Sequence, residues 1–381
     1  MAKHALLSAS SSARWLNCPP SLLLNKKVED EEKGSIFAQE GTLAHELGEY
    51  KAIKEFSCNA DLPDLEAIKA HDLYDEDMEY YTDRYLDYLK DIVYGMSPEP
   101  SVLVEQRVSY DKYAKDGFGT ADFIAVGDGV LHVCDLKYGR GIEVSAVDNP
   151  QLKLYALGVV DMYKPVYNVK KVVMHIIQPR LNNYSSCEVS VGELLDFGDL
   201  VKYKSKLALK GEGNFCAGEH CRFCKVRATC RERAEANLRL AGFAKEQPHL
   251  LSNDEVAECL TIAKDLTAWA KDLESYALNE LLNGGDVKGY KVVEGRSRRV
   301  INDTKGFAEY LKHCDYKEDE IYKPKELLGI TALEKIIGRK KFTELSDGYI
   351  DKPAGKPTLV TLDDKRQAIN KNIEEIFKEE N

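Results

Sequence analysis

The sequence predicts an α/β fold in which a mixed β-sheet is flanked by helices. Three short apolar segments follow one another at Val102–Val108, Phe118–Val126 and Val130–Leu136, and the first alternates as a strand does. A helical segment at Pro150–Val160 then leads to a fourth strand at Val169–Gln178. Three consecutive strands followed by a helical crossover give a mixed sheet with helices on its faces.

The local signals support each element. Asp128-Gly129, a dipeptide typical of tight hairpins, separates the second strand from the third. Serines at position 8 and positions 10–12 offer N-caps for a first helix at Ala13–Cys18. Two further helices are expected at Gly41–Lys54 and Asp75–Val93, before the first strand.

The part of the chain after the fourth strand is predicted to be mainly helical. Residues 195–245 read as helix around a cysteine-rich turn at 216–230, and a long amphipathic helix covers Asp254–Leu282. We expect a domain at 1–240, a helical connector at 241–285 and a small α/β region at 286–381. The last region ends in a helix at Asp363–Lys378, and no chemistry is recognisable in it.

Composition excludes several classes of protein. The 44% hydrophobic and 31% charged residues are typical of a soluble globular chain, and no apolar run reaches the length of a membrane span. The N-terminus lacks the apolar stretch of a signal peptide, so the cytoplasm is the expected compartment. The net charge of −11 disfavours a purely electrostatic nucleic-acid binder. In a reducing compartment, the ten cysteines are expected as small buried residues or metal ligands.

Four polar features follow one another on the elements where hydrolytic chemistry would need them. A histidine lies on a helix, an aspartate begins a strand, an Asp-x-Lys ends the next strand, and a Gln-x-x-x-Tyr lies on the helix after it. In chain order these residues are His45, Asp122, Asp135, Lys137, Gln151 and Tyr155. Each alone is weak, because an Asp-x-Lys is common as an edge-strand ion pair and a lone histidine is usually structural.

Together these residue types fit phosphodiester hydrolysis, which needs a metal that generates hydroxide and stabilises the developing charge. Carboxylates supply the oxygen ligands that Mg²⁺ and Mn²⁺ prefer, and the His45 imidazole shifts the preference towards Mn²⁺. Strand alternation puts Asp135 and Lys137 on one face. Asp135 can then hold the metal while Lys137 orients or deprotonates water, or neutralises the scissile phosphate.

This set resembles the RecB-like branch of the PD-(D/E)XK nucleases, which includes AddB and the CRISPR-adaptation nucleases. The resemblance covers about residues 1–235 and implies a restriction-endonuclease-like core that hydrolyses DNA. The family often has a proline near its second acidic residue, and this chain has none there. The whole chain also resembles phage and prophage proteins, which implies a role in phage recombination or replication and a single-strand annealing or replication protein as partner.

Roles follow from the resemblance by position. His45, Asp122 and Asp135 become metal ligands, with the backbone carbonyl of Leu136 as a fourth, and Lys137 becomes the catalytic lysine. Gln151 and Tyr155 would position DNA or the lysine. Glu105, on the preceding strand, is a weaker candidate for a second metal or a supporting role.

A second constellation is formed by cysteines. Cys221, Cys224 and Cys230 form a C-x₂-C-x₅-C cluster, and Cys18 lies far upstream. They resemble the iron–sulfur staple of the same nucleases, which implies a [4Fe–4S] cluster that ties the two ends of the domain together. Zn²⁺ could take the same thiolates, and His220 or Cys216 could replace Cys18. The other cysteines lack such spacing and are expected to be structural: Cys58, Cys134, Cys187, Cys259 and Cys314.

Basic residues near the site suggest a groove that follows phosphates, although a solvated surface is equally compatible with each one. They are Arg107, Lys112, Arg140, Lys153 and Arg180. A denser basic patch surrounds the cysteines and would contact DNA or offset the cluster's charge. The expected function is a DNA exonuclease or end-processing nuclease; a catalytically inactive DNA-binding scaffold and an RNA nuclease are the alternatives. Oligomerisation is left open.

Overall fold

The computed structural model describes residues 5–28, 36–57, 61–163, 166–243, 251–293 and 303–314, with isolated positions at 338, 341, 342 and 345. The chain divides into two compact units, Met1–Arg299 and Val300–Asn381. All candidate site residues belong to the first unit. In the second, helix α11 spans Thr304–His313. The expected helix at Asp363–Lys378 lies outside the described residues, as does most of the expected α/β region.

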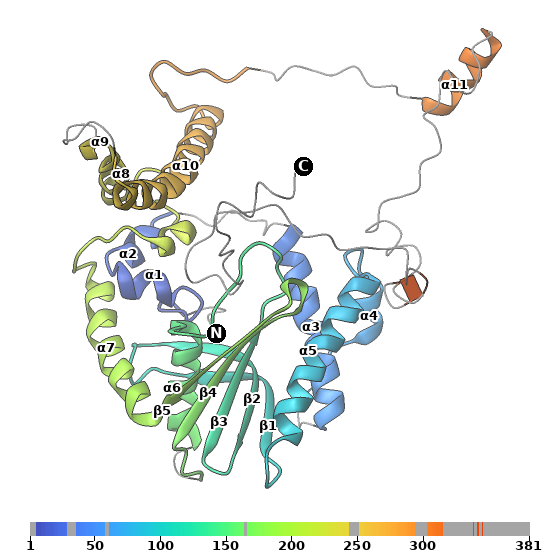
Figure 1. The fold of residues 1–381 in the computed structure, drawn as a ribbon, viewed down its shortest axis with the longest axis vertical. Helices are drawn as coiled ribbons and strands as arrows, with labels where there is room; N and C mark the ends of the chain where they lie inside the picture. Colours follow the sequence, from blue (N-terminus) through green and yellow to red (C-terminus); the bar gives the residue numbers. More distant parts are fainter. Residues whose placement is uncertain are drawn as a thin grey trace, which may run out of the picture. The chain divides into compact units, whose positions relative to one another are not determined.

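A five-stranded mixed sheet forms the centre of the first unit (Figure 1). Its strands lie in chain order: β1 (Ser101–Ser109), β2 (Phe118–Gly127), β3 (Val130–Leu136), β4 (Lys171–Gln178) and β5 (Asn183–Ser190). Neighbouring strands are antiparallel except β3 and β4, which are parallel and joined through helix α6 (Pro150–Tyr163). The predicted α/β class, with its mixed sheet, is confirmed and is consistent with a restriction-endonuclease-like core.

Strand β5 is an element that sequence patterning missed. Its residues, NYSSCEVS, are mostly polar and carry no apolar alternation. It forms the edge of the sheet by pairing with β4 after the short 3₁₀ turn η1 (Pro179–Leu181). This strand is therefore stabilised by pairing with the apolar strand β4 and not by an apolar pattern of its own.

Helices cover both faces of the sheet (Figure 1). Strand residues alternate between the faces, so Phe123 and Cys134 pack with α3 (Ile36–Phe56) and α5 (Glu76–Tyr94). Their neighbours Ile124 and Val133 pack on the other side. There the covering helices are α6 and α7 (Val191–Lys210). Helix α1 (Ser12–Asn17) packs against α6 and α7, and α2 (Ser21–Lys26) packs against α7.

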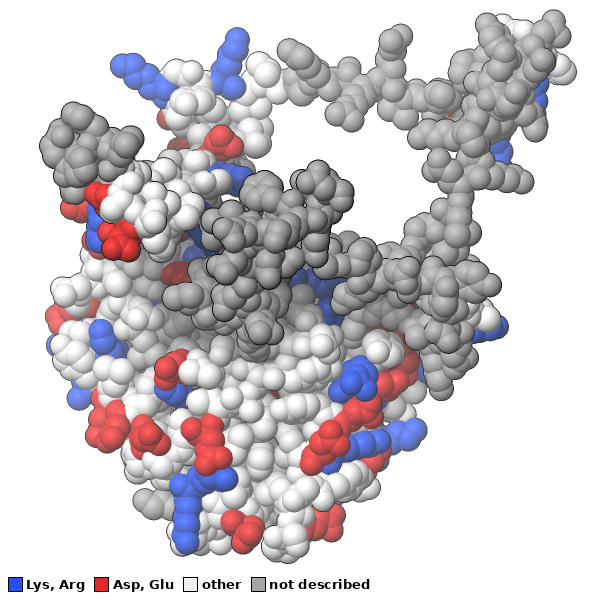
Figure 2. All heavy atoms as spheres, in the orientation of Figure 1, with Lys and Arg blue, Asp and Glu red and all other residues white. Residues whose placement is uncertain are grey.

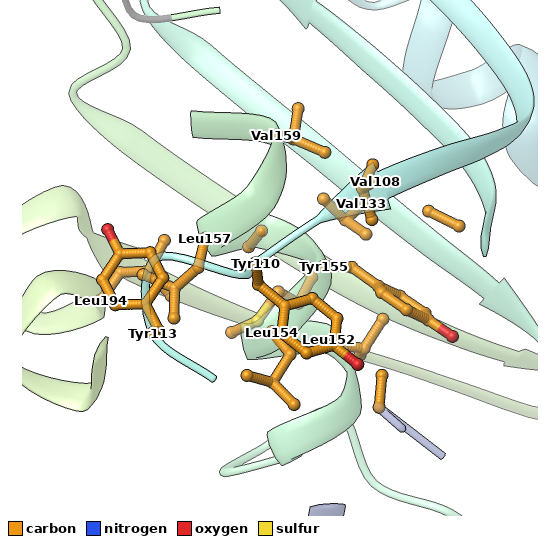
Figure 3. Close-up of a cluster of buried hydrophobic side chains, with 14 of the residues drawn as sticks. Val108, Tyr110, Tyr113, Val133, Leu152, Leu154, Tyr155, Leu157, Val159 and Leu194 are labelled. Carbon is orange, nitrogen blue, oxygen red and sulfur yellow. The ribbon is translucent and has the colours of Figure 1, made fainter. Parts of the chain in front are cut away.

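Helix α6 is buried on nearly every side, which fixes the residues it carries. Every residue from Leu154 to Val160 is buried. Figure 3 shows α6 side chains, Val159 among them, in one cluster with Val108 and Val133 from the sheet. At Gly158 a Cβ atom would lie 2.8 Å from the backbone oxygen of Ser109, so only glycine allows this close packing.

The remaining helices include the short α4 (Leu65–Lys69), which contacts α3. The cysteine-rich segment contains the 3₁₀ turn η2 (Glu219–Phe223) and is followed by α8 (Arg231–Leu238), α9 (Leu240–Phe243) and α10 (Asn253–Leu282). Among the described helices, none combines the length and apolar character needed to cross a bilayer.

Candidate metal centre and cysteine cluster

Three carboxylates form one row across the first three strands. The residues on either side of Glu105 pair with those on either side of Asp122, so these two side chains stand opposite each other. Phe123 pairs with Cys134, which makes Asp122 and Asp135 the next opposing positions on β2 and β3. The pairing register of the strands therefore brings together three acidic residues that are far apart in the sequence: Glu105, Asp122 and Asp135.

Glu105 interrupts the regular pairing of β1. Its φ is +47°, a left-handed conformation that costs a non-glycine residue roughly 1–3 kcal/mol. The register is the same before and after it, so no residue is inserted. The strained backbone is thus confined to the position that faces Asp122.

His45, Glu105 and Asp122 form a group suited to a divalent cation. One ligand atom from each lies within 4.8 Å of the others, and His45 Nδ1 is 3.5 Å from Asp122 Oδ2. One imidazole nitrogen and two carboxylate oxygens match the preferences of Mn²⁺ and, less strictly, Mg²⁺. Glu105, a minor candidate from sequence, is thus a member of the group.

The electrostatics of this row favour a cation. Burial, together with the charges of Asp122, Glu49 and Asp135, raises the pKa of Glu105 to about 8. Burial also raises the pKa of Asp122 to about 6; His45 opposes that rise and Asp135 adds to it. Carboxyls with raised pKa values repel one another when ionised, and a bound cation removes that repulsion.

Asp135 is engaged by a different set of residues. It is 2% exposed, and the ammonium of Lys137 lies 2.8 Å from its Oδ2. Gln151 Nε2 donates to Asp135 Oδ1 at 2.9 Å, and Gln151 Oε1 accepts from Lys137 Nζ at 3.4 Å. Tyr155 OH lies 3.2 Å from Gln151 Nε2. Of the residues expected to be catalytic, Lys137 and Gln151 therefore contact Asp135 directly, and Tyr155 contacts it through Gln151.

The protonation of Lys137 narrows its possible roles. Burial acts to lower the pKa of its ammonium, but the charges of Asp135 and Asp122 outweigh burial and hold the pKa above its ordinary value. A lysine held in its charged form is a poor base for water. It is well suited to neutralise a phosphate or to orient a water molecule.

Leu136 joins the two halves of the site. Its N–H donates to Asp122 Oδ2 at 2.7 Å, which ties the middle of the carboxylate row to the end of β3. The next residue, Lys137, donates its own N–H to the oxygen of Ile177 on β4 at 2.9 Å. The strand end that carries the Asp-x-Lys is thus fixed from both neighbouring strands.

The basic residues expected to bind phosphate are mostly occupied by carboxylates. Four form ion pairs of 2.7–3.4 Å, and the Arg107 guanidinium instead lies 3.8 Å from the ring centre of Phe118. The four pairs are Lys112–Asp161, Arg140–Asp77, Lys153–Asp148 and Arg180–Glu40. On the face shown in Figure 2, described basic and acidic side chains are interspersed. A groove that follows phosphates stays a prediction.

The cysteines expected to bind a cluster line one small cavity. Cys18, which follows α1, faces it together with Cys221, Cys224 and Cys230, and all are free thiols. Asn25 Nδ2 donates to Cys224 Sγ at 3.2 Å, and the backbone N–H of Cys216 donates to the Cys18 thiol. Burial raises the pKa values of Cys18 and Cys221.

The two alternative ligands line the same cavity, so the arrangement does not separate them from Cys18. Cys216 and His220 are both present, and a His220 ring nitrogen lies 2.9 Å from the Cys216 oxygen. The other described cysteines lie elsewhere: Cys134 is buried in the sheet, Cys187 is in β5, Cys259 is in α10 and Cys314 is exposed. Cys58 lies outside the described residues.

Two arginines of the basic patch near the cysteines form ion pairs with carboxylates of α10. Arg233 is 2% exposed and pairs with Asp265 and Asp272 of α10 at 2.8 and 2.7 Å. Arg227 also pairs with Asp272 at 2.8 Å, and Trp269 Nε1 donates to the Ala228 oxygen. These two arginines attach α10 to the cysteine segment, because a buried guanidinium needs carboxylate partners.

Comparison with known proteins identifies the family. The family model described as "Protein of unknown function (DUF2800)" matches residues 4–367. The chain belongs to this family. Among solved structures, it is similar to the one titled "Crystal structure of SSO0001", at 13% identity and a TM-score of 0.26. That match covers 58% of this DUF2800 chain and 96% of the other, and at this TM-score it carries no argument about function.

Proposed function

We propose that this DUF2800 protein is a metal-dependent nuclease of the RecB-like PD-(D/E)XK type that hydrolyses phosphodiester bonds in DNA. The observation that carries the proposal is the meeting of Lys137 and Gln151 on the buried Asp135, in the same row as Glu105 and Asp122. A purely structural ion pair does not need two further carboxylates with raised pKa values beside it.

The donor set fits a hard divalent cation, held by His45, Glu105 and Asp122, with Asp135 and the Leu136 carbonyl as the further ligands the resemblance implies. Such an ion would supply activation of water and stabilisation of charge on phosphate. Lys137, kept charged by Asp135, would neutralise a phosphate oxygen. Gln151 holds the lysine and the carboxylate together, and Tyr155 orients the Gln151 amide.

We further propose that Cys18, Cys221, Cys224 and Cys230 hold a [4Fe–4S] cluster. The four cysteines line one cavity, and four thiolates are the ligand set of a [4Fe–4S] cluster. Zinc, which binds the same thiolates, is the alternative.

The deciding experiment incubates anaerobically purified protein with labelled linear double-stranded DNA, single-stranded DNA and RNA, in Mg²⁺, Mn²⁺ or EDTA. Lys137→Ala is compared with Lys170→Ala, which removes an exposed lysine. Metal-dependent DNA loss in wild type and Lys170→Ala but not in Lys137→Ala supports the proposal. Preferential loss of RNA would change the substrate, and DNA binding without any cleavage would favour an inactive scaffold.

The cellular setting is proposed on resemblance alone. A cytoplasmic enzyme of phage DNA recombination or replication would meet DNA ends beside an annealing or replication protein. Such a partner would supply the substrate, so a mixture with the partner belongs in the same assay.

A further inference from the structure

The loop at residues 137–149 joins the two halves of the proposed catalytic group. It begins with Lys137 at the end of β3 and ends just before Gln151 in the first turn of α6. Both side chains contact Asp135. The path of this loop therefore decides how the two residues meet.

Two buried amides from the β4–β5 turn hold this loop. Gln178 Nε2 donates to the oxygen of Ile142 at 2.9 Å, and its Oε1 accepts from the Val144 N–H at 2.7 Å. Asn183 Nδ2 donates to the Val144 oxygen at 2.8 Å and to Gln178 Oε1 at 2.7 Å. These four hydrogen bonds join the two amides to the backbone of the loop and to each other.

Two further residues of this region contact the loop, one near each of its ends. Ser185 Oγ, on β5, accepts from the N–H of Ala146 at 3.0 Å. Arg180, in the turn itself, places its guanidinium carbon 4.5 Å from the ring centre of Tyr138, the residue after Lys137. The turn therefore contacts the loop from residue 138 to residue 146.

Burial makes this network specific. Gln178 and Asn183 are 2% and 4% exposed, and buried amides are unfavourable unless their hydrogen bonds are made. The observed course of the loop satisfies these donors and acceptors together, and another course would have to break some of these hydrogen bonds. Apolar residues in the same places would leave the backbone groups of Ile142 and Val144 without these partners.

We propose that Gln178 and Asn183 are positioning residues for the nuclease reaction, and this inference rests on the proposed function. They fix the loop so that Lys137 and Gln151 meet on Asp135. Neither amide contacts a reacting group itself; both act through the loop backbone. Loosening the pair is expected to separate Gln151 from the lysine while the metal-binding residues on α3, β1 and β2 stay in place.

The test combines Gln178→Met, which keeps the shape but removes the hydrogen bonds, with Gln151→Ala in a double-mutant cycle. DNA cleavage by Gln178→Met is expected to fall about 10- to 100-fold at saturating Mg²⁺. In the Gln151→Ala background, Gln178→Met is expected to change the rate less than about twofold, because its effect passes through Gln151. Fold-changes that multiply in the double variant would overturn the inference and indicate a merely structural role.

A second variant and a matched control keep the result readable. Ser185→Ala removes one contact of the same loop and should show a smaller, again non-multiplicative, loss. Ser205→Ala removes a buried hydrogen bond to the Tyr113 oxygen, outside the loop, and should leave cleavage near the wild-type rate. Should the control lose as much activity as Gln178→Met, general destabilisation explains the effect and the positioning role fails.

Failure of the proposed function is distinguishable from failure of the inference. If wild type cleaves no nucleic acid, both fall. If wild type cleaves and Gln178→Met cleaves equally fast, only the positioning role falls. Hydrogen exchange checks the mechanism: Gln178→Met should lose protection at Val144 and its neighbours, whereas loss across the whole sheet would contradict it.

Discussion

The Lys137 ammonium lies 2.8 Å from Oδ2 of a carboxylate, Asp135, that is almost completely buried. Removing the lysine leaves that charge poorly compensated, which typically costs about 3 kcal/mol or more. Lys137→Met should therefore lower the free energy of unfolding by about 3 kcal/mol at pH 7.5. Urea unfolding of variant and wild type checks this.

Lys170→Met is the control for that experiment, because it removes an exposed lysine and should change stability little. Mg²⁺ should restore part of the stability of Lys137→Met, since a cation replaces the missing charge. A loss of stability that is insensitive to Mg²⁺ would show that Lys137 contributes packing alone.

Metal binding should be coupled to proton release at the carboxylate row. The pKa of Glu105 is raised to about 8 and that of Asp122 to about 6, whereas a bound cation requires both groups ionised. Affinity for Mn²⁺ should therefore weaken as pH falls from 8.5 to 6.5. Glu105→Gln should bind more weakly and lose much of this pH dependence. Titration calorimetry in buffers of different ionisation enthalpy measures the released protons, and pH-independent binding by wild type would contradict the assignment.

The cysteine assignment predicts which substitutions remove iron. Anaerobically purified wild type should be brown and contain iron, and Cys18→Ala and Cys224→Ala should each lose colour and stability. Cys216→Ala and His220→Ala should retain both, although both residues line the same cavity. Iron and zinc analysis with absorption spectra separates the outcomes. If Cys216→Ala lost its colour and Cys18→Ala kept it, Cys216 would be the fourth ligand in place of Cys18.

The ion pairs that attach α10 should respond differently to removal of the arginine and to removal of its aspartate partners. Arg233 is buried, whereas its partner Asp265 is 45% exposed at the side chain and Asp272 19%. Removing both aspartates leaves a buried guanidinium without carboxylate partners, which costs more than removing the arginine and leaving two hydrated carboxylates. The double Asp265→Ala, Asp272→Ala variant should thus be less stable than Arg233→Met by thermal unfolding. The reverse order would indicate that the arginine's packing dominates.

Sequence predicted the elements that carry their own pattern. The third strand was placed at Val130–Leu136, as observed, because apolar alternation and a hairpin signal define it. Strand β5 was not predicted because its residues are mostly polar and its conformation depends on pairing with β4. The expected helix at Gly41–Lys54 extends to Ile36–Phe56 in the structure, since helix ends depend on tertiary packing.

The members of the site could be predicted where they are close together in the sequence. They were harder to predict where only the pairing register of the strands brings them together. Asp135, Lys137 and Gln151 follow from spacing, and they meet in the structure. The membership of Glu105 depends on the β1–β2 register and on a backbone distortion, neither of which has a local signal. Gln178 and Asn183 bind a loop more than thirty residues upstream, so no motif marks them.

The buried His175, which contacts the partly exposed His132, predicts how the protein responds to acid. A ring nitrogen of His175 lies 3.0 Å from one of His132, its other nitrogen lies 3.1 Å from Tyr88 OH, and the rings of the two histidines stack. Burial, followed by the charge of His132, lowers the pKa of His175 to about 3. Its pKa in the unfolded chain is about 6.5. Between these values the unfolded state binds one more proton, so the stability is complete above pH 6.5 and decreases as pH falls.

Below pH 6.5 this difference in proton binding should lower the free energy of unfolding by about 1.4 kcal/mol per pH unit, or by about 2 kcal/mol at pH 5. His175→Gln removes this titration, so its stability should fall less between pH 7 and pH 5 than that of wild type. His71→Gln, which replaces an exposed histidine, should keep the wild-type slope. Chemical denaturation at half-unit pH intervals measures all three proteins. An unchanged slope in His175→Gln would mean that acid destabilises the fold through its carboxylates, because the buried imidazole would then contribute no proton uptake on unfolding.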